Sequence, residues 1–207
     1  MTQRKIEWLF FDIGSTLVDE SACHEHRLKQ LAAQEGAPDI YALNEMTAES
    51  ARRLGSGYKE AAARYGLALP PWPSHMERLY PGVPAALEYL SGRYRLGIIA
   101  NQLPGAEKRL NDFGILRYFG AVISSADEGV SKPDPEIFRR ALMRTGCRPE
   151  NAVMAGDRPD NDIFPAKALG MGTIWVKQGM YACADMSLFP CMPDICLDGI
   201  NEITHYL

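Results

Sequence analysis

The chain has 207 residues, a length that suits one hydrophobic core or a core with a modest insertion. Hydrophobic residues make up 46% of it and charged residues 23%, so the composition is that of an ordinary globular protein. Its net charge of −4 provides no broad positive field for nucleic acid or anionic lipid, and we expect neither as a partner.

The N-terminal segment and the cysteines indicate the cellular compartment of the protein. The apolar run after Lys5 is interrupted by Asp12 before it reaches the length of a signal peptide. No other segment approaches the ~20 apolar residues of a membrane span. The five cysteines are odd in number and form no CxxC pair, a pattern typical of reduced thiols and not of a disulfide framework or a zinc site. We therefore predict a cytoplasmic protein.

The first third of the chain predicts one strand followed by helices. Apolar residues 6–11 have strand character and end on Asp12. Residues 21–35 and 45–64 then show apolar side chains at three-to-four spacing, as amphipathic helices do. Residues 66–75, "GLALPPWPSH", form a proline-rich break and are the expected hinge.

From residue 81 onward the predicted helices and strands alternate. Helices are expected at 83–90, 106–113, 135–144 and 163–169, and strands at 96–100, 121–124, 152–155 and 173–176. This alternation indicates right-handed βαβ units on a parallel sheet, with helices on both faces. The strand at 6–11 should join this sheet, which makes residues 19–80 a helical insertion. Residues 194–207 are expected to add a short strand and a closing helix.

Polar residues follow the predicted strands at the point where each strand ends. Asp12 follows the first strand, Asn101 follows "LGIIA", Lys132 lies in the loop after "AVIS", and Asp157 follows "AVMAG". In open parallel α/β sheets, ligands bind beyond the carboxyl ends of the strands. Each residue alone could simply begin a loop or cap a helix. The whole set, with Asp162 completing "GDRPDND", predicts a functional site.

Transfer of a dianionic phosphoryl group is the chemistry that needs this set. A carboxylate such as Asp12 can attack as a nucleophile and form an acyl phosphate. Because carboxylate and phosphate repel each other, a cation is needed between them. Mg²⁺ suits oxygen ligands from one or two carboxylates, of which Asp157 would be the second. Lys132 would supply a fixed positive charge for the equatorial oxygens of the transferring group.

These residues stand in motifs that resemble those of the haloacid dehalogenase superfamily of phosphatases. The motifs are "FFDIGSTL", "LGIIANQ", "GVSKPDPEIF" and "AGDRPDNDIFPAKALGMGTIWV", in that family's order and spacing. The resemblance covers nearly the whole chain. It implies an α/β fold in which residues 1–18 and 81–207 form a Rossmann-like core and residues 19–80 form a small α-helical cap.

The resemblance also implies a role for each matched residue. Asp12 would be the nucleophile and a Mg²⁺ ligand. Asp157, the backbone carbonyl of Gly14 and Asp162 would complete the metal site, with Asp162 either a ligand or a holder of metal-bound water. Lys132 would clamp the phosphate. Substrate would also contact Asn101, Ser15 and Thr16.

Two positions depart from the family's pattern. Its phosphatases carry a second Asp two residues after the nucleophile, as general acid and then base, and this chain has Gly14 there. They also usually have Ser or Thr before the Asn of "LGIIANQ", where this chain has Ala100, which removes one phosphate contact. Loss of general acid or base help is worth about 10² to 10⁴ in rate.

Two consequences of Gly14 stay open at this point. The substrate could have a good leaving group, such as an acyl or aryl phosphate, which needs no proton as it departs. Alternatively, a residue of the insertion could replace the missing acid. The candidates lie just downstream and are Asp19, Glu20, His24 and His26.

Three functions compete on the sequence alone. We expect a Mg²⁺-dependent phosphohydrolase that acts on a small phosphorylated metabolite through an aspartyl-phosphate intermediate, with a homodimer left open. A non-catalytic or weakly active binding protein with the same fold is the alternative, and Gly14 and Ala100 support it. A metal-free dehalogenase would gain nothing from the acidic "GDRPDND".

Overall fold

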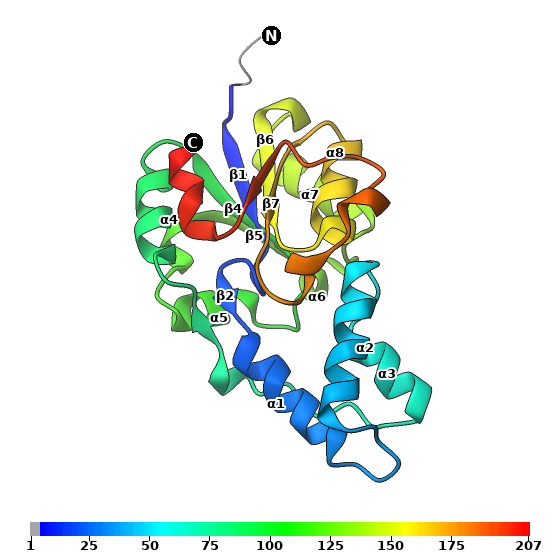
Figure 1. Cartoon of the computed structure of the whole chain (residues 1–207). Helices are drawn as coiled ribbons and strands as arrows, with labels where there is room; N and C mark the ends of the chain where they lie inside the picture. Colours follow the sequence, from blue (N-terminus) through cyan, green and yellow to red (C-terminus); the bar gives the residue numbers. More distant parts are fainter. Residues whose placement is uncertain (1–4) are drawn as a thin grey trace.

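The computed structural model describes residues 5–207, so the first four residues of the predicted core segment 1–18 lie outside it. A six-stranded sheet in the order β5-β4-β1-β6-β7-β8 forms the centre of the molecule, and all its neighbouring strands pair in parallel (Figure 1). The strands are β1 (Trp8–Phe11), β4 (Arg95–Ala100), β5 (Phe119–Ser124), β6 (Ala152–Gly156), β7 (Gly172–Val176) and β8 (Ile195–Leu197). The predicted α/β fold with a parallel sheet is confirmed.

The sheet carries a hydrophobic core on each face, because successive side chains of a strand point to opposite sides. Leu9 and Phe11 of β1 belong to one core cluster, with residues of α4 (Val83–Ser91) and α5 (Ala106–Asp112). Trp8 and Phe10 belong to the other, with residues of α7 (Pro135–Thr145) and α8 (Phe164–Ala168). The near-continuous apolar run of β1 is thus explained by burial on both faces.

Three helices are inserted between the first strand of the sheet and α4. They are α1 (Ser21–Ala32), α2 (Ile40–Arg52) and α3 (Tyr58–Tyr65), and Figure 1 shows them gathered at one end of the molecule. Their apolar side chains form a core cluster separate from those of the sheet, made of Leu28, Leu31, Leu43, Tyr58, Ala61 and Ala62. The helical insertion therefore carries its own small core.

A short antiparallel ribbon joins the two ends of the insertion. In this ribbon β2 (Val18–Asp19) pairs with β3 (Arg78–Leu79). The chain thus leaves and re-enters the sheet region through neighbouring segments. Sequence patterns did not predict the ribbon, because two-residue strands carry no periodicity.

Residues 45–64, predicted as one helix, form parts of two helices instead. The chain leaves α2 at Arg52 and starts α3 at Tyr58, and both Leu54 and Gly57 have a φ of 61° between them. A right-handed helix cannot contain such residues. The helix predicted at 163–169 begins earlier, with a π-helical turn η4 (Pro159–Ile163) that precedes α8.

The remaining helices are short. The closing helix predicted in the tail is a 3-10 helix, η7 (Ile200–His205). Others are η1 (Ser74–Met76), η2 (Leu116–Tyr118), α6 (Ser125–Glu128), η3 (Pro149–Asn151), η5 (Met180–Cys183) and η6 (Met186–Leu188). Within residues 5–207, no helix has both the length and the apolar character needed to cross a membrane.

Candidate active site

The polar residues predicted to follow the strands meet at one edge of the sheet. Asp12 comes directly after β1, Asn101 after β4 and Asp157 after β6, and these three strands are neighbours in the sheet. Lys132 lies in the loop between α6 and α7. Because the carboxyl ends of parallel strands lie together, residues as far apart as 12 and 157 share one site.

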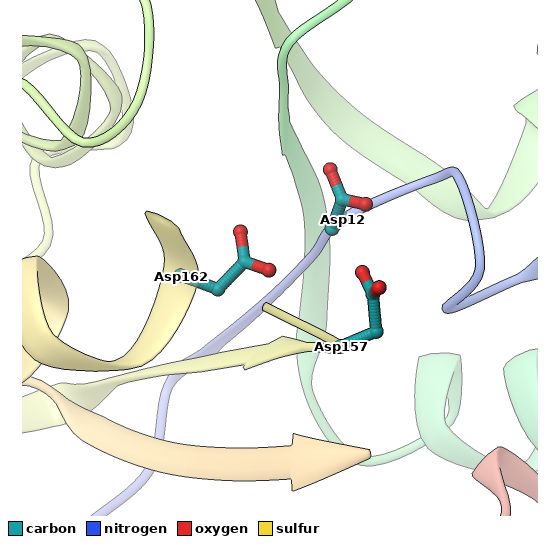
Figure 2. A group of neighbouring side chains, drawn as sticks. All are labelled: Asp12, Asp157 and Asp162. Carbon is teal, nitrogen blue, oxygen red and sulfur yellow. The ribbon is translucent and has the colours of Figure 1, made fainter. Parts of the chain in front are cut away.

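Three buried carboxylates converge in this site. Figure 2 shows Asp12, Asp157 and Asp162 approaching one another from three segments, and one oxygen of each lies within 4.8 Å of the others. Asp162 is held by the π-helical turn, where its Oδ2 accepts a hydrogen bond of 3.0 Å from the backbone N–H of Arg158. The turn thus brings a residue five positions after Asp157 back to face it.

Lys132 is the cation of the cluster. Its Nζ atom donates hydrogen bonds of 2.6 Å to Oδ1 of Asp12 and 2.6 Å to Oδ1 of Asp162, and one of 2.9 Å to the carbonyl oxygen of Ile99. Burial by itself lowers the pKa of this ammonium, but the carboxylates of Asp12 and Asp162 outweigh it and raise the pKa above its ordinary value. The side chain is therefore a permanent positive charge.

One lysine does not balance three carboxylates. Burial, followed by the charges of Asp12 and Asp162, raises the pKa of Asp157 well above its ordinary value. Burial likewise raises the pKa of Asp162 to about 6, against the lowering effect of Lys132. Buried charges are costly unless they are paired or bind a metal. Three hard oxygen donors with excess negative charge are the donor set that Mg²⁺ prefers, and the residues present fit that ion.

Gly14 lies beside a fourth carboxylate, that of Glu20. A Cβ atom placed on Gly14 would lie 2.7 Å from both carboxylate oxygens of Glu20 and 2.9 Å from its Cδ. Gly14 is not in the left-handed region of backbone conformation, whereas Ser15 has a φ of 54°. Close approach of Glu20, and not a turn, therefore accounts for the glycine.

Arg109 of α5 holds Glu20. Its Nη2 atom lies 3.0 Å from Oε1 of Glu20 and 2.8 Å from Oε1 of Glu77, while its Nε donates to Oε2 of Glu77 at 2.9 Å. Burial raises the pKa of Glu20 to about 7, against the lowering effect of Arg109. Sequence reasoning missed Arg109 and Glu77, because neither lies in a motif or next to one in the chain.

The site opens into a cavity of about 1000 Å³ between the sheet edge and the inserted helices. The insertion contributes aromatic walls: the ring of His24 lies 5.1 Å from that of Trp72 and 5.7 Å from that of Tyr58. Arg27 stacks over Trp72 at 4.9 Å and donates to the hydroxyl of Tyr58. The cavity is large enough for a small metabolite.

The residues predicted to contact substrate have different positions and partners in the structure. Ser15 and Asn101 line the cavity. Thr16 is fully buried and donates a hydrogen bond of 3.4 Å to Oδ1 of Asp157. Both polar atoms of the Asn101 side chain form hydrogen bonds of 2.8 Å with the backbone of Lys132. Thr16 and Asn101 therefore brace the charged residues.

The four candidates for a replacement acid differ in whether they line the cavity. Glu20 and His24 line the cavity. Asp19 accepts a hydrogen bond from the backbone N–H of Ser21, and His26 lies outside the cavity lining described within residues 5–207. His24 Nε2 lies 3.9 Å from Oε2 of Glu20. Burial keeps the pKa of this imidazole down at about 4, so the pair is a polar contact and not an ion pair near neutral pH.

Comparison with known families agrees with this geometry. The sequence model of the haloacid dehalogenase-like hydrolases matches residues 9–176, which include all the carboxylates of the site. The chain belongs to this family and is a hydrolase. The glyceraldehyde 3-phosphate phosphatase of Pyrococcus furiosus is 32% identical over 88% of this chain and 85% of its own.

Solved structures share the fold. A predicted phosphoglycolate phosphatase from Haemophilus somnus 129PT superposes with a TM-score of 0.74 at 19% identity, over 98% of both chains. The hydrolase YfnB from Bacillus subtilis, solved with bound magnesium, gives a TM-score of 0.68 at 20% identity, over 98% of this chain and 99% of its own. At these identities the likeness is one of fold.

Proposed function

We propose that the protein is a Mg²⁺-dependent phosphohydrolase that acts on a small phosphorylated metabolite through a covalent phosphate on Asp12. The observation that carries the proposal is the position of Asp12, which directly follows the central strand β1. Its carboxylate accepts a hydrogen bond from the ammonium of Lys132 and lies in one cluster with the carboxylates of Asp157 and Asp162. The name of the P. furiosus relative, a glyceraldehyde 3-phosphate phosphatase, supports the same substrate class.

In this proposal each charged residue has one task. Asp12 attacks phosphorus, and its rigid place at the end of β1 holds the attacking oxygen in line. Asp12, Asp157, Asp162 and the backbone carbonyl of Gly14 would hold the Mg²⁺ ion. Bound there, the ion would offset the repulsion between the carboxylate of Asp12 and the phosphate. Lys132 stabilises the charge that develops on the equatorial oxygens.

Neighbouring residues keep this arrangement in place. Thr16 holds Asp157 through its hydroxyl, and Asn101 holds the backbone of Lys132. Ser15, in the wall of the cavity, contacts the phosphate. We assign residues 19–80 to a cap whose aromatic wall selects the substrate, over a core of residues 1–18 and 81–207. The five cysteines are free, in keeping with the cytoplasmic location that the sequence predicts.

The buried charges argue against a metal-free dehalogenase and against a non-catalytic binding protein. A metal-free dehalogenase has no use for the second and third carboxylates, which repel its nucleophile. A non-catalytic binding protein has no need of Lys132, Asp12 and Asp162 in one buried cluster, because such clusters seldom add stability.

A screen of phosphorylated metabolites tests the proposal. We expect release of inorganic phosphate with Mg²⁺, none with excess chelator, and none from Asp12→Asn, which removes the nucleophile without changing the size of the side chain. The melting temperature of the variant reports on its fold. Near-normal turnover by a folded Asp12→Asn protein would contradict the covalent route, and halide release from chloro-acids in chelator would favour the dehalogenase.

A further inference from the structure

We propose that Glu20 donates a proton to the leaving group and then accepts one from the attacking water, standing where a side chain on residue 14 would be. This inference rests on the proposed function and names the proton carrier of that same site.

The carboxylate of Glu20 occupies the volume beside Gly14. Both oxygens of Glu20 lie 2.7 Å from the position of a Cβ on residue 14, which is within the reach of one carboxylate group on that Cβ. A carboxyl group on residue 14 and that of Glu20 would therefore compete for one space. Residue 14 is two positions from Asp12 in the loop after β1, and both Gly14 and Glu20 line the cavity. The Glu20 carboxyl thus lies against the loop that carries the nucleophile.

The two carboxylate oxygens of Glu20 have unequal partners. Oε1 accepts a hydrogen bond of 3.0 Å from Arg109, whereas the polar neighbours of Oε2 are Ser15 Oγ at 3.5 Å and His24 Nε2 at 3.9 Å. Arg109 is fixed in turn by Glu77. One oxygen is therefore anchored, and the other is held only at long range and can exchange a proton with a ligand.

The other carboxyl groups of the cavity lining are each paired elsewhere or belong to the candidate metal site. Asp157 and Asp162 belong to the cluster around Lys132. The side chain of Glu77 is 3% exposed and pairs with Arg109. It also accepts a hydrogen bond of 2.6 Å from the indole N–H of Trp72. Asp112 pairs with Lys108 on an exposed face of α5. Among the carboxyl groups described in the cavity lining, Glu20 alone lies outside the cluster and against the loop that carries Asp12.

The two steps balance. An oxygen of Asp12 forms a bond to phosphorus, the bond from phosphorus to the leaving oxygen breaks, and that oxygen takes the proton of the Glu20 carboxyl. Water then attacks the phosphorus, the Glu20 carboxylate takes a proton from the water, and the bond to Asp12 breaks. Inorganic phosphate leaves, and Glu20 is again protonated. Both proton transfers pass through the same oxygen.

The test compares two esters of similar size. Benzyl phosphate has an alkoxide leaving group that needs a proton, and 4-nitrophenyl phosphate does not. We expect Glu20→Gln to lose about 10² to 10⁴ in rate on benzyl phosphate and to change little on 4-nitrophenyl phosphate. Glu25→Gln is the control, because it makes the same change on α1 at a side chain that is 65% exposed. It should leave both rates unchanged.

A second experiment moves the carboxyl group from residue 20 to residue 14. Gly14→Asp in the presence of Glu20 places two carboxyl groups in one space, so we expect it to lower both rates. Gly14→Asp combined with Glu20→Ala restores one carboxyl to the same volume and should recover benzyl phosphate hydrolysis relative to Glu20→Ala alone. Recovery of this kind is not expected if Glu20 is merely structural.

A binding measurement separates this role from substrate binding. The rise in melting temperature produced by Mg²⁺ with inorganic phosphate should be the same in Glu20→Gln and in the wild type. Loss of that rise, or equal loss on both esters, would overturn the role of Glu20 while leaving the proposed function intact. A wild-type protein that hydrolyses neither these esters nor any screened phosphate would overturn the proposed function, and the role of Glu20 with it.

Discussion

Asn101 and Lys132 exchange two hydrogen bonds of 2.8 Å. The Asn101 side chain donates from Nδ2 to the carbonyl of Lys132 and accepts at Oδ1 from its backbone N–H. The residue that follows β4 thereby holds the loop after α6 against the sheet edge. The buried ammonium of Lys132 depends on this brace for its position beside Asp12.

Removal of the brace should cost activity. We expect Asn101→Ala to lower kcat by roughly 10- to 100-fold, the usual cost of losing a residue that orients a catalytic group. Asn111→Ala on α5 is the matched control and should have no effect, because Asn111 is exposed and outside the cavity lining. Steady-state kinetics of both variants check this, and equal rates for the two would remove Asn101 from the mechanism.

Lys132 should matter far more than other lysines near the cavity. We expect Lys132→Ala to lower activity by at least about 10² to 10³, since it removes the fixed charge that faces the phosphate. It should also lower the melting temperature, because Asp12 and Asp162 lose their buried partner. Lys108→Ala is the comparison, with a side chain that is 79% exposed. Small and equal effects for both lysines would contradict the assignment.

Mg²⁺ should stabilise the fold as well as support turnover. When the free concentration of an ion is 100 times its dissociation constant, its binding to the folded state adds about 2.7 kcal/mol to the free energy of unfolding. We therefore expect Mg²⁺ to raise the melting temperature of the wild type, and to do so much less in Asp157→Asn. Asp198→Asn, at a side chain 81% exposed, should respond as the wild type does. Ca²⁺ should restore turnover poorly, because its looser coordination shell misplaces the phosphate.

A response to Mg²⁺ that is unchanged in Asp157→Asn would place the ion elsewhere. Calorimetric titration of the two variants with Mg²⁺ gives the same comparison without any enzymatic assay.

His24 should make the protein sensitive to acid. Burial lowers the pKa of its imidazole to about 4, assisted by the charges of Arg27 and Lys59 and opposed by Asp19. In the unfolded chain the pKa is about 6.5. Between these values the unfolded state binds more protons, so the stability that neutral His24 allows is lost as the pH falls from about 6.5 toward 4.

The variant His24→Gln should lose less stability between pH 7 and pH 5 than the wild type does. Glu20, whose pKa is raised to about 7, titrates in the same window with the opposite sign, but it is present in both proteins. The difference in urea midpoint between the two proteins at each pH therefore reports on His24. A difference that does not depend on pH would mean that the imidazole titrates normally.

The sequence by itself determined the strands of the sheet and the residues that end them. An apolar run such as 8–11 followed by Asp12 carries its signal locally, and the alternation of strands and helices dictates a parallel sheet. Parallel strands place the residues at their carboxyl ends together, so the meeting of Asp12, Asn101 and Asp157 followed from topology. The helix predicted at 45–64 was wrong because the left-handed backbone of Leu54 and Gly57 has no counterpart in hydrophobic spacing.

Only the tertiary structure decided what faces Gly14. Glu20 could be named as one of four neighbours in the chain, but its carboxylate reaches the space beside Gly14 because Arg109, 89 residues away, holds it there. Thr16 likewise turns inward to Asp157, 141 residues away, and not toward the cavity. Contacts of this kind depend on how separately formed elements pack, and no local pattern of residues encodes them.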